Sequence, residues 1–349
     1  MWKEFKKNKL ALISFWILFI FYFLALLADF FAPYRYDDED IEYSFAPPTK
    51  IYFLNLKEKI YQPHIYAYRY KRNQYYMRVY QPDKNKPIPI KFFAKGFKYK
   101  LLGVIPLDIH LFGVDEGRIY LLGADLYGRD IFSRLLYGAR ISLSIGLVGV
   151  LISFFLGLIV GGVSGYFGGV LDTILMRFIE ILMMLPSFYI MLALRASFPP
   201  SVSSTQVYLL TVIILSLIGW AYIARVIRGM ALSLKEQDFV LAAKACGVGS
   251  FKIITRHILP HTYSYVIAAI CLSIPGYILG EASLSLIGLG IQEPQASWGN
   301  MLAQASDIVS IKFYPWILLA GLCVIVVTLC FNIIGDTLRD ILDPKRKIF

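Results

Sequence analysis

The longest uncharged stretches of this 349-residue chain limit what it can fold into. Three of them contain 19, 31 and 23 residues, at Leu10–Ala28, Ile141–Leu171 and Phe313–Gly335. Their lengths match or exceed the roughly 20 apolar residues with which an α-helix crosses a bilayer core. A hydrophobic fraction of 57% and a mean hydropathy of +0.60 agree with that interpretation. We therefore predict an all-α polytopic membrane protein.

Three further segments bring the predicted number of transmembrane helices to six. Val207–Ala224 is an uncharged run of 18 residues, and Thr262–Gly280 is another that continues toward Ile291. Asp172–Leu194 is the least apolar of the six, because it carries three charged residues in its first half. Each segment is long enough for one crossing.

The basic residues of the chain, whose net charge is +11, predict its orientation. Cytoplasmic loops of membrane proteins are enriched in Lys and Arg. If the N-terminus is inside, six spans place three basic clusters on the same side: Lys3, Lys6, Lys7 and Lys9; Arg225, Arg228, Lys235, Lys244, Lys252 and Arg256; and Arg339, Lys345, Arg346 and Lys347. We therefore predict that both termini are cytoplasmic.

Residues 32–120, after the first span, are predicted to form a small β-rich extracytoplasmic insertion. Tyr66, Tyr68 and Tyr70 alternate with other residues, as Phe97 and Tyr99 do with lysines. This period of two is typical of half-buried strands. The basic strands present either a solvated face or a docking surface for a partner or peptide, and outside a membrane we expect no nucleic acid. All four cysteines lie elsewhere, so no disulfide framework is expected.

A helix is predicted to begin at Asp130, whose carboxylate stabilises a helix start. We expect this helix to lie along the outer surface of the membrane, ahead of the second span. Its apolar face would consist of Ile131, Leu135 and Leu136. Two arginines, Arg134 and Arg140, are expected at the membrane interface. The second span is rich in glycine, which allows helices to pack closely in lipid, so we expect it to be a buried inner helix.

Four ionisable residues within the predicted spans are candidates for the translocation path or its gate: Asp172, Arg177, Glu180 and Glu281. Such residues are costly in hydrocarbon and often functional. Arg177 and Glu180, three residues apart, are placed to pair. The first three residues form either a structural network near a cytoplasmic gate or a direct contact with substrate. Glu281 either lines the path or packs through hydrogen bonds.

Lys235–Pro260 is a polar and basic island between the fourth and fifth spans. Good helix formers from Phe239 to Cys246 end at Gly247, which readily adopts the left-handed conformation that closes a helix. Ser250 is predicted to cap a second helix that ends near His257, and Pro260 suits the first turn of the next span.

The island has the composition of a plug for another protein's surface. Three small side chains would allow the other protein to approach closely: Ala242, Ala243 and Ala245. Three larger ones would fill a pocket in it: Phe239, Phe251 and Ile254. An ordinary helical hairpin between two spans is the alternative.

Within this island, AAKACG, nine further residues and HILP resemble the EAA loop of ABC importer permeases, whose coupling helices dock into a cytoplasmic ATPase. The chain has Leu241 where that pattern has Glu, and His257 where it has Ile. The resemblance assigns ATPase coupling to nine residues: Leu241, Ala242, Ala243, Gly247, Ser250, Phe251, His257, Leu259 and Pro260.

Other segments resemble, in order, the dipeptide, oligopeptide and nickel permease family. They are LLGADLYGRDIFSRLLYGARISLSIG at 121–146, the segment around Glu281, QEPQASWGNML at 292–302 and GDTLRDILDPKRK at 335–347. PIPIKFFAKGFKYKLLGVIPLDIHLFGV resembles the exported insertion of a subgroup that imports oligopeptides and the peptide antibiotic microcin C.

The resemblance implies a type I ABC importer permease fold in three parts. Residues 1–31 would be the cytoplasmic N-terminus and first transmembrane helix, and residues 32–120 the extracytoplasmic insertion. Residues 121–349 would form the permease core, with a cytoplasmic coupling loop at residues 229–260.

The same resemblance implies a permease subunit of an ATP-driven peptide importer in the bacterial inner membrane. Its partners would be a second permease subunit, two ATPase subunits and an extracytoplasmic binding protein, besides lipid and peptide. ATP and Mg would bind the ATPases, so no cofactor is expected in this chain. Nickel or another small solute is the alternative cargo, and which peptide is carried stays open.

A membrane-embedded enzyme and a scaffold that only tethers an ATPase are the competing classes. The sequence lacks a G-x-x-x-x-G-K-[ST] phosphate loop. His257 and His261 have the spacing of H-E-x-x-H but lack its Glu, so no metal site is expected. A scaffold would need neither the glycine-rich span nor Glu281.

Overall fold

The computed structural model describes residues 2–53, 62–72, 74, 78–199 and 202–342. Among these residues, five helical segments are long and apolar enough to cross a membrane: Lys9–Leu26, Ile131–Phe167, Ser204–Leu234, Ser250–Leu286 and Pro315–Leu342. A bent pair of helices, Gly169–Met184 and Ser187–Ala196, would add a sixth crossing. A mostly helical membrane protein is therefore confirmed, with five or six candidate spans.

The described residues divide into two compact units. The first lies within Met1–Phe19, Leu143–Gly290 and Val324–Phe349, and the second within Ile20–Ser142 and Ile291–Cys323. Three helices contribute residues to both units: α2 (Lys9–Leu26), α4 (Ile131–Phe167) and α13 (Leu319–Leu342).

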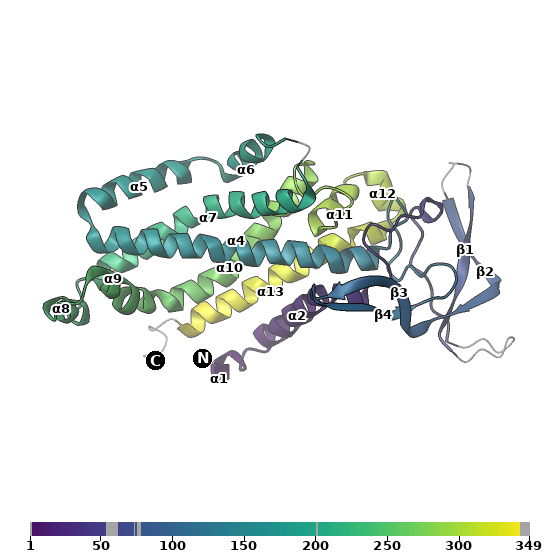
Figure 1. Ribbon diagram of the computed structural model, residues 1–349, viewed down its shortest axis with the longest axis horizontal. Coiled ribbons are helices and arrows are strands. Elements are labelled where there is room, and N and C mark those ends of the chain that lie inside the picture. The colour runs from purple at the N-terminus through teal and green to yellow at the C-terminus, as the bar shows by residue number, and fades with distance from the viewer. Residues whose placement is uncertain (1, 54–61, 73, 75–77, 200–201, 343–349) are drawn as a thin grey trace. The chain divides into compact units, whose positions relative to one another are not determined.

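Close packing of α4 against α7 (Ser204–Leu234) organises the first unit (Figure 1). A Cβ atom at Gly157 would lie 2.6 Å from Ile223 Cγ2, and one at Gly161 would lie 2.5 Å from the carbonyl oxygen of Ala224. Glycine is thus required for this approach. The expectation that the glycine-rich span packs closely is confirmed.

The helix after Asp130 differs from the prediction. The cap is confirmed, because Ser133 N donates a hydrogen bond of 2.8 Å to Asp130 Oδ2. However, α4 runs without interruption from Ile131 to Phe167, so no separate surface helix precedes the second span. The chain has no proline between Ile131 and Phe167, and a continuous helix keeps every backbone hydrogen bond.

The third predicted span is broken into α5 (Gly169–Met184) and α6 (Ser187–Ala196), with a bend of 86° between them. Leu185 has an extended backbone, with φ −79° and ψ 132°, and Pro186 follows it. Proline has no amide hydrogen and disfavours a helical residue before it. The sequence prediction of one span overlooked this break.

The remaining helices of the first unit are the N-terminal α1, the helices and turns of the coupling loop, and the long helix that follows it. They are α1 (Trp2–Phe5), α8 (Asp238–Ala245), α9 (Ser250–Ile253), a π-helical turn (Ile254–Ile258), a 3-10 turn (Leu259–Thr262) and α10 (Tyr263–Leu286). Figure 1 shows α8, α9, α1 and the end of α13 at the same end of this unit. Asn8 Nδ2 donates a hydrogen bond of 3.0 Å to Thr337 Oγ1, which ties the N-terminal segment to α13.

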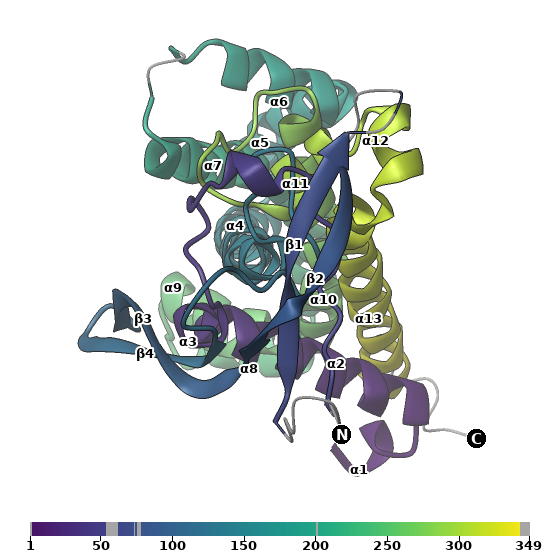
Figure 2. The ribbon, with the colours of Figure 1, turned by 90° about the vertical axis from the view of Figure 1, so that its right-hand side faces the viewer.

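The second unit contains two antiparallel β-hairpins, whose strands are labelled in Figure 2. Strand β1 (His64–Arg72) pairs with β2 (Arg78–Pro89), and β3 (Lys91–Leu101) pairs with β4 (Ile105–Gly113). Both predicted runs of alternating aromatics lie in these strands, so the β-rich insertion is confirmed. Short helices complete the unit: α3 (Ala28–Phe31), a 3-10 turn (Ile41–Tyr43), α11 (Trp298–Gln304), α12 (Ile308–Phe313) and a 3-10 turn (Pro315–Leu318).

A buried ion network holds the second unit together and corrects the expectation that Arg134 lies at the membrane interface. Arg134 is fully buried and donates a hydrogen bond of 3.0 Å to Glu293 Oε1. Arg129 bridges Glu293 at 2.6 Å and Asp125 at 2.7 Å. Buried charges need such partners. Arg134 is therefore buried because Glu293, from a distant segment, balances its charge.

Candidate coupling site and transport path

The end of α8 has the geometry that the sequence predicts. Gly247 adopts φ +74°, in the left-handed region that favours glycine. Val248 N donates to Ala243 O at 3.1 Å, and Gly247 N donates to Lys244 O at 3.0 Å. These two bonds form a Schellman motif, which satisfies the last carbonyl groups of the helix. Gly247 therefore fixes the corner between α8 and α9.

The start of α9 corrects the predicted role of Ser250. The N-cap residue is Gly249, with φ −62° and ψ 148°, and Ser250 is the first residue of the helix and makes no cap bond from its side chain. The chain is already extended at Gly249, so the helix begins one residue earlier than predicted. Beyond it, the hydrogen-bond pattern changes to π-helical and then 3-10 around Pro260, which has no amide hydrogen to donate.

A small hydrophobic core joins the coupling loop to the end of α7. Its buried members are Ala231, Val240, Ala243, Ile253 and Ile258. Ala231 belongs to α7, and the others belong to α8, α9 and the π-helical turn. The loop is thus packed against the helix that leads into it and is not a free connector.

Packing within the chain corrects the expected exposure of two loop residues. Ala243 was expected to allow close approach of another protein and Ile254 to fill a pocket in it, but their side chains are only 8% and 5% exposed. Both face the protein's own helices. Helical periodicity explains the error for Ala243, because Val240 and Ala243 are three residues apart and share the inner face of α8.

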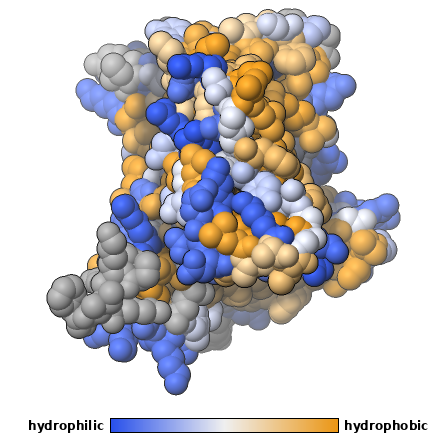
Figure 3. Space-filling model, turned by 90° about the vertical axis from the view of Figure 1, so that its left-hand side faces the viewer, coloured by the Kyte–Doolittle hydropathy of each residue, from blue (hydrophilic) through white to orange (hydrophobic). Residues whose placement is uncertain are grey.

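An exposed apolar set remains on the outside of the loop. Phe251 is 78% exposed and Leu241 is 45% exposed, and Phe239, Ala242 and Ala245 are exposed beside them in the sequence. We call these five residues the coupling surface. Figure 3 views the first unit from the end where α8 and α9 lie and shows apolar residues among hydrophilic ones. Gly247 and Ser250 are also exposed, whereas His257, Leu259 and Pro260 are half-buried.

A polar cluster connects three helices of the first unit. Arg228 Nε on α7 donates to Asp172 Oδ1 on α5 at 2.9 Å, and Nη2 donates to Oδ2. Ser164 Oγ on α4 donates to Asp172 Oδ1 at 2.5 Å. Sequence reasoning named Asp172 but missed these partners. The signal available was that Arg228 is a cation near the same predicted membrane face.

The other charged pair near this cluster is exposed. Arg177 Nη1 donates to Glu180 Oε2 at 2.9 Å, which confirms that the two residues pair. The Arg177 side chain is 76% exposed. Arg177 and Glu180 therefore form a pair of their own, and each remains a candidate for the path or gate.

Glu281 is fully buried on α10. Ser285 Oγ, one turn further along, donates a hydrogen bond of 2.7 Å to Glu281 Oε1. On the same helix, Tyr277 OH lies 2.5 Å from Ser153 Oγ of α4, and Ser153 Oγ donates to Ser216 O of α7 at 2.9 Å. The interior of the bundle therefore contains hydrogen-bonded polar side chains at several levels.

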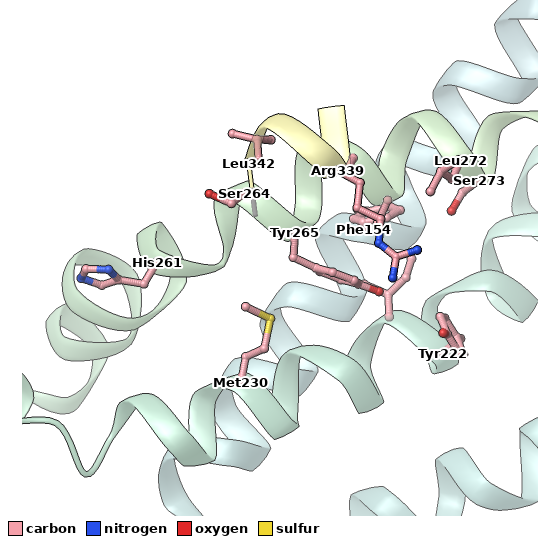
Figure 4. Close-up of a pocket in the computed structure, with 13 residues that line it drawn as sticks. Phe154, Tyr222, Met230, His261, Ser264, Tyr265, Leu272, Ser273, Arg339 and Leu342 are labelled. Carbon is pink, nitrogen blue, oxygen red and sulfur yellow. The ribbon is translucent and has the colours of Figure 1, made fainter. Parts of the chain in front are cut away.

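A cavity of about 680 Å³ opens between α4, α7, α10 and α13. Its lining mixes apolar side chains with hydroxyl groups and one guanidinium: Phe154, Tyr222, Met230, Tyr265, Leu272, Ser273 and Arg339 are among its residues. Figure 4 shows the Arg339 side chain extending from α13 toward Tyr265. Sequence reasoning missed this cavity, because four distant segments contribute to it and no local motif marks them.

One contact connects the coupling surface with this cavity. The ring of Phe239 lies 4.7 Å from the ring of His261, measured between centroids. His261 also lines the cavity. A movement of α8 would therefore displace His261 in the cavity wall.

Comparison with known proteins gives this arrangement a family. Residues 153–348 match the binding-protein-dependent transport system inner membrane component family, and residues 1–48 match the N-terminal TM domain of oligopeptide transport permease C. The chain belongs to the family of binding-protein-dependent transport system inner membrane components. The first match includes the coupling loop and all four path candidates.

Individual members of this permease family extend the similarity over the whole chain. The dipeptide transport system permease protein DppC of Lactococcus lactis subsp. cremoris is 32% identical over 345 residues, which is 99% of this chain and 89% of the relative. The oligopeptide transport system permease protein OppC of Haemophilus influenzae is 41% identical over 227 residues, covering 65% and 70%.

DppC of Bacillus subtilis is 39% identical over 241 residues, covering 69% of this chain and 70% of the relative. Among solved structures, the crystal structure of an amino acid ABC transporter with histidines matches with a TM-score of 0.42 and 17% identity. That match covers 59% of this chain and 92% of the solved chain.

Proposed function

We propose that this chain is the permease subunit of an ATP-driven importer for peptides and forms half of its translocation pathway. The family match and the names of the relatives, which are oligopeptide and dipeptide permeases, support this proposal. A second permease subunit would supply the other half of the pathway. Two cytoplasmic ATPases would bind ATP and Mg, and an extracytoplasmic protein would deliver the peptide.

The mechanism rests on the coupling surface. Its residues are exposed, and the helices that carry them pack against α7 through a shared hydrophobic core. In this mechanism the ATPases bind the coupling surface, and their closure on ATP moves α8 and α9. Because the core joins these helices to α7, the movement reaches the spans and opens the pathway outward. The free energy for this movement comes from the different affinities with which the ATPases bind the two conformations of the permease.

The proposed topology has six spans, with the bent pair α5 and α6 as one of them and both termini in the cytoplasm. The placement of α1, the end of α13 and the coupling loop at the same end of the first unit supports it. Of the third basic cluster, Arg339 lies on α13, and Lys345, Arg346 and Lys347 lie outside the described residues. The domain boundaries at residues 31/32 and 120/121 belong to the same proposal.

Thiol labelling tests the topology. In a cysteine-free variant, single cysteines are placed at Asn85 in β2 and at Ser250 in α9. An impermeant thiol reagent applied to the outer face of the membrane should label Asn85→Cys and not Ser250→Cys. Labelling of both sites, or the reverse pattern, contradicts the six-span orientation.

Docking of the ATPase tests the function. Phe251→Asp places a charge on the coupling surface without disturbing the buried core, so the complex should lose ATPase subunits and transport. Ile41→Asp is the matched control, since Ile41 is also an exposed apolar residue but belongs to the second unit. Full ATPase occupancy with Phe251→Asp would contradict the proposed coupling. Mass spectrometry of ligand bound to the intact complex distinguishes a peptide from nickel.

A further inference from the structure

The β3–β4 hairpin packs against α3, the short helix that follows a candidate span. Helix α2 ends at Leu26, and α3 begins at Ala28 after a single break. Both strands of the hairpin contact α3. The two ring nitrogens of His110 on β4 lie 2.9 Å from Asp29 O and 3.1 Å from Phe97 O, so this buried side chain connects α3 with both strands. The ring of Phe93 lies 6.4 Å from that of Phe30 on α3. Figure 2 shows the hairpin beside α3.

The length of α2 sets the depth of α3 and hence of the hairpin. With 18 residues, α2 spans about 27 Å at a rise of 1.5 Å per residue, close to the roughly 30 Å of hydrocarbon in a bilayer. A segment that follows within two residues must lie at the level of the headgroups. The hairpin that packs on this segment therefore lies at the membrane surface.

The surface of this hairpin is unusually apolar for a segment in water. Six large apolar side chains are exposed on it: Phe92, Phe93, Leu102, Val104, Ile105 and Ile109. Val104, in the turn, is 79% exposed and Phe93 is 65% exposed. Phe93 and Leu102 also adopt positive φ values of 54° and 51°, which are costly for side chains of this size. Phe92 and Phe93 lie at the open end of the hairpin, and Leu102, Val104 and Ile105 gather at its turn. Exposed apolar side chains that gather in this way mark a surface that binds something.

Lysines surround these apolar groups. Lys95, Lys98 and Lys100 alternate with other residues along β3 and are exposed, whereas Asp108 is the only acidic residue between Lys91 and Gly113. An apolar surface bordered by lysines has the composition of segments that lie in a bilayer interface and attract anionic lipids.

The β1–β2 hairpin of the same unit provides an internal comparison. It is also basic, with Lys71, Arg72 and Lys84 exposed. However, its isoleucines Ile65 and Ile88 are buried in a core with other residues of the unit, and Tyr70 and Val79 are its exposed large apolar side chains among the described residues, against six in the β3–β4 hairpin. Positive charge alone therefore does not distinguish the two hairpins. The combination of charge, exposed apolar side chains and contact with α3 is what the β3–β4 hairpin has in addition.

We propose that the β3–β4 hairpin is a membrane-interface anchor, whose apolar turn inserts among the lipids next to α2 and whose lysines bind anionic phospholipid headgroups. The lipid surface is the occupant because the hairpin packs against the short helix that follows a candidate membrane span and carries the complementary charge. The anchor would hold the second unit at a fixed height above the bilayer. This inference goes beyond the transport function and does not depend on what is transported.

Fluorescence of the full chain in reconstituted vesicles tests the insertion. A polarity-sensitive fluorophore is attached to a single cysteine at Val104, and in a separate control at Lys84, in a cysteine-free variant. In vesicles with anionic phosphatidylglycerol, the Val104 probe should be quenched by lipids that carry a nitroxide in the acyl chain and be protected from aqueous iodide. The Lys84 probe should show the opposite. Quenching of both probes by iodide alone overturns the proposal.

Substitution of the lysines tests the role of charge. The triple variant Lys95→Gln, Lys98→Gln and Lys100→Gln should lose at least half of the lipid quenching that anionic vesicles add over zwitterionic ones. The variant Lys71→Gln, Arg72→Gln and Lys84→Gln removes the same charge from the other hairpin and should keep it. Equal loss in both variants would mean a non-specific effect of net charge and would overturn headgroup binding.

A protein partner is the competing occupant, and the same probe detects it. If the Val104 probe remains open to iodide in vesicles of the chain alone and becomes shielded only in the assembled complex, the hairpin docks on protein and the lipid anchor is wrong. Shielding that is already complete in the chain alone supports the anchor.

Discussion

Arg228 on α7 holds the carboxylate of Asp172 on α5 with two donors of its guanidinium, and Ser164 on α4 donates to the same carboxylate. The consecutive helices α4 and α5 are thus joined to the more distant α7 through one ion pair. Because the Asp172 side chain is only 11% exposed, loss of its partner leaves a poorly solvated charge.

Arg228→Ala should destabilise the chain by about 1–3 kcal/mol, because a part-buried carboxylate then loses its cation. The purified chain in detergent should unfold at a lower temperature. Arg177→Ala removes an arginine from an exposed pair and should change stability by less than about 0.5 kcal/mol. Equal decreases in the unfolding temperature of the two variants would show that the Arg228–Asp172 pair contributes no more to stability than the exposed Arg177–Glu180 pair.

Gly247→Val should distort the corner between α8 and α9 and cost about 1–2 kcal/mol, because a β-branched side chain is strained at φ +74°. The spans should still insert, while fewer ATPase subunits co-purify with the complex. Gly249→Val is the matched control, since Gly249 has an ordinary φ of −62° and open space around it. Retention of full ATPase occupancy by Gly247→Val would show that the corner does not position the coupling surface.

Glu281→Gln should leave both stability and uptake close to those of the wild type. Glu281 is fully buried within this chain, and glutamine keeps an acceptor for the hydroxyl of Ser285. Glu281→Leu removes that acceptor and should lower stability by about 1–3 kcal/mol. Paired uptake and unfolding measurements check both expectations. A Gln variant that assembles normally but has lost uptake would assign the charge itself a role in the path.

Asp130 should make stability depend on pH. Burial raises the pKa of Asp130 to about 7, from an ordinary value of 3.8. The folded chain therefore retains a proton that the unfolded chain has released between pH 4 and 7, so stability falls by up to about 1.4 kcal/mol per unit as pH rises through this window. Above pH 7 the contribution of this group is constant.

Asp130→Asn tests this dependence, because asparagine cannot ionise but keeps an acceptor for Ser133. Unfolding temperatures of the two proteins should agree near pH 4 and below, where Asp130 is protonated in both the folded and the unfolded chain, and the variant should be the more stable one at pH 8. Curves that remain parallel from pH 5 to 8 would exclude Asp130 as the source.

Local sequence patterns made much of the fold predictable. Uncharged runs located the main spans, and the alternation around Tyr68 and Tyr99 located strands of the two hairpins. Gly247 was predictable for the same reason, since a helix end depends on local backbone conformation. Ser250 was misplaced by one residue because glycine can also act as an N-cap.

Features that depend on distant segments were not predictable. Arg134 looked like an interfacial arginine until Glu293, 159 residues away, was found to pair with it. Ala243 looked exposed because the sequence does not show which face of α8 meets Ile253 and Ile258. The cavity between α4, α7, α10 and α13 is a product of packing alone. In each case the missing information was the identity of the neighbour.

The glycines of α4 also limit how the transporter can move. Gly157, Gly161 and Gly165 are spaced by four residues and form a row of notches that receive Ile223, Ile227 and Ala231 of α7. A slide of one helix along the other would drive these side chains into the neighbouring backbone, and the next register that fits is four residues away, about 6 Å at a rise of 1.5 Å per residue. We therefore expect α4 and α7 to move as one rigid body. A displacement of α8 would then tilt both helices together.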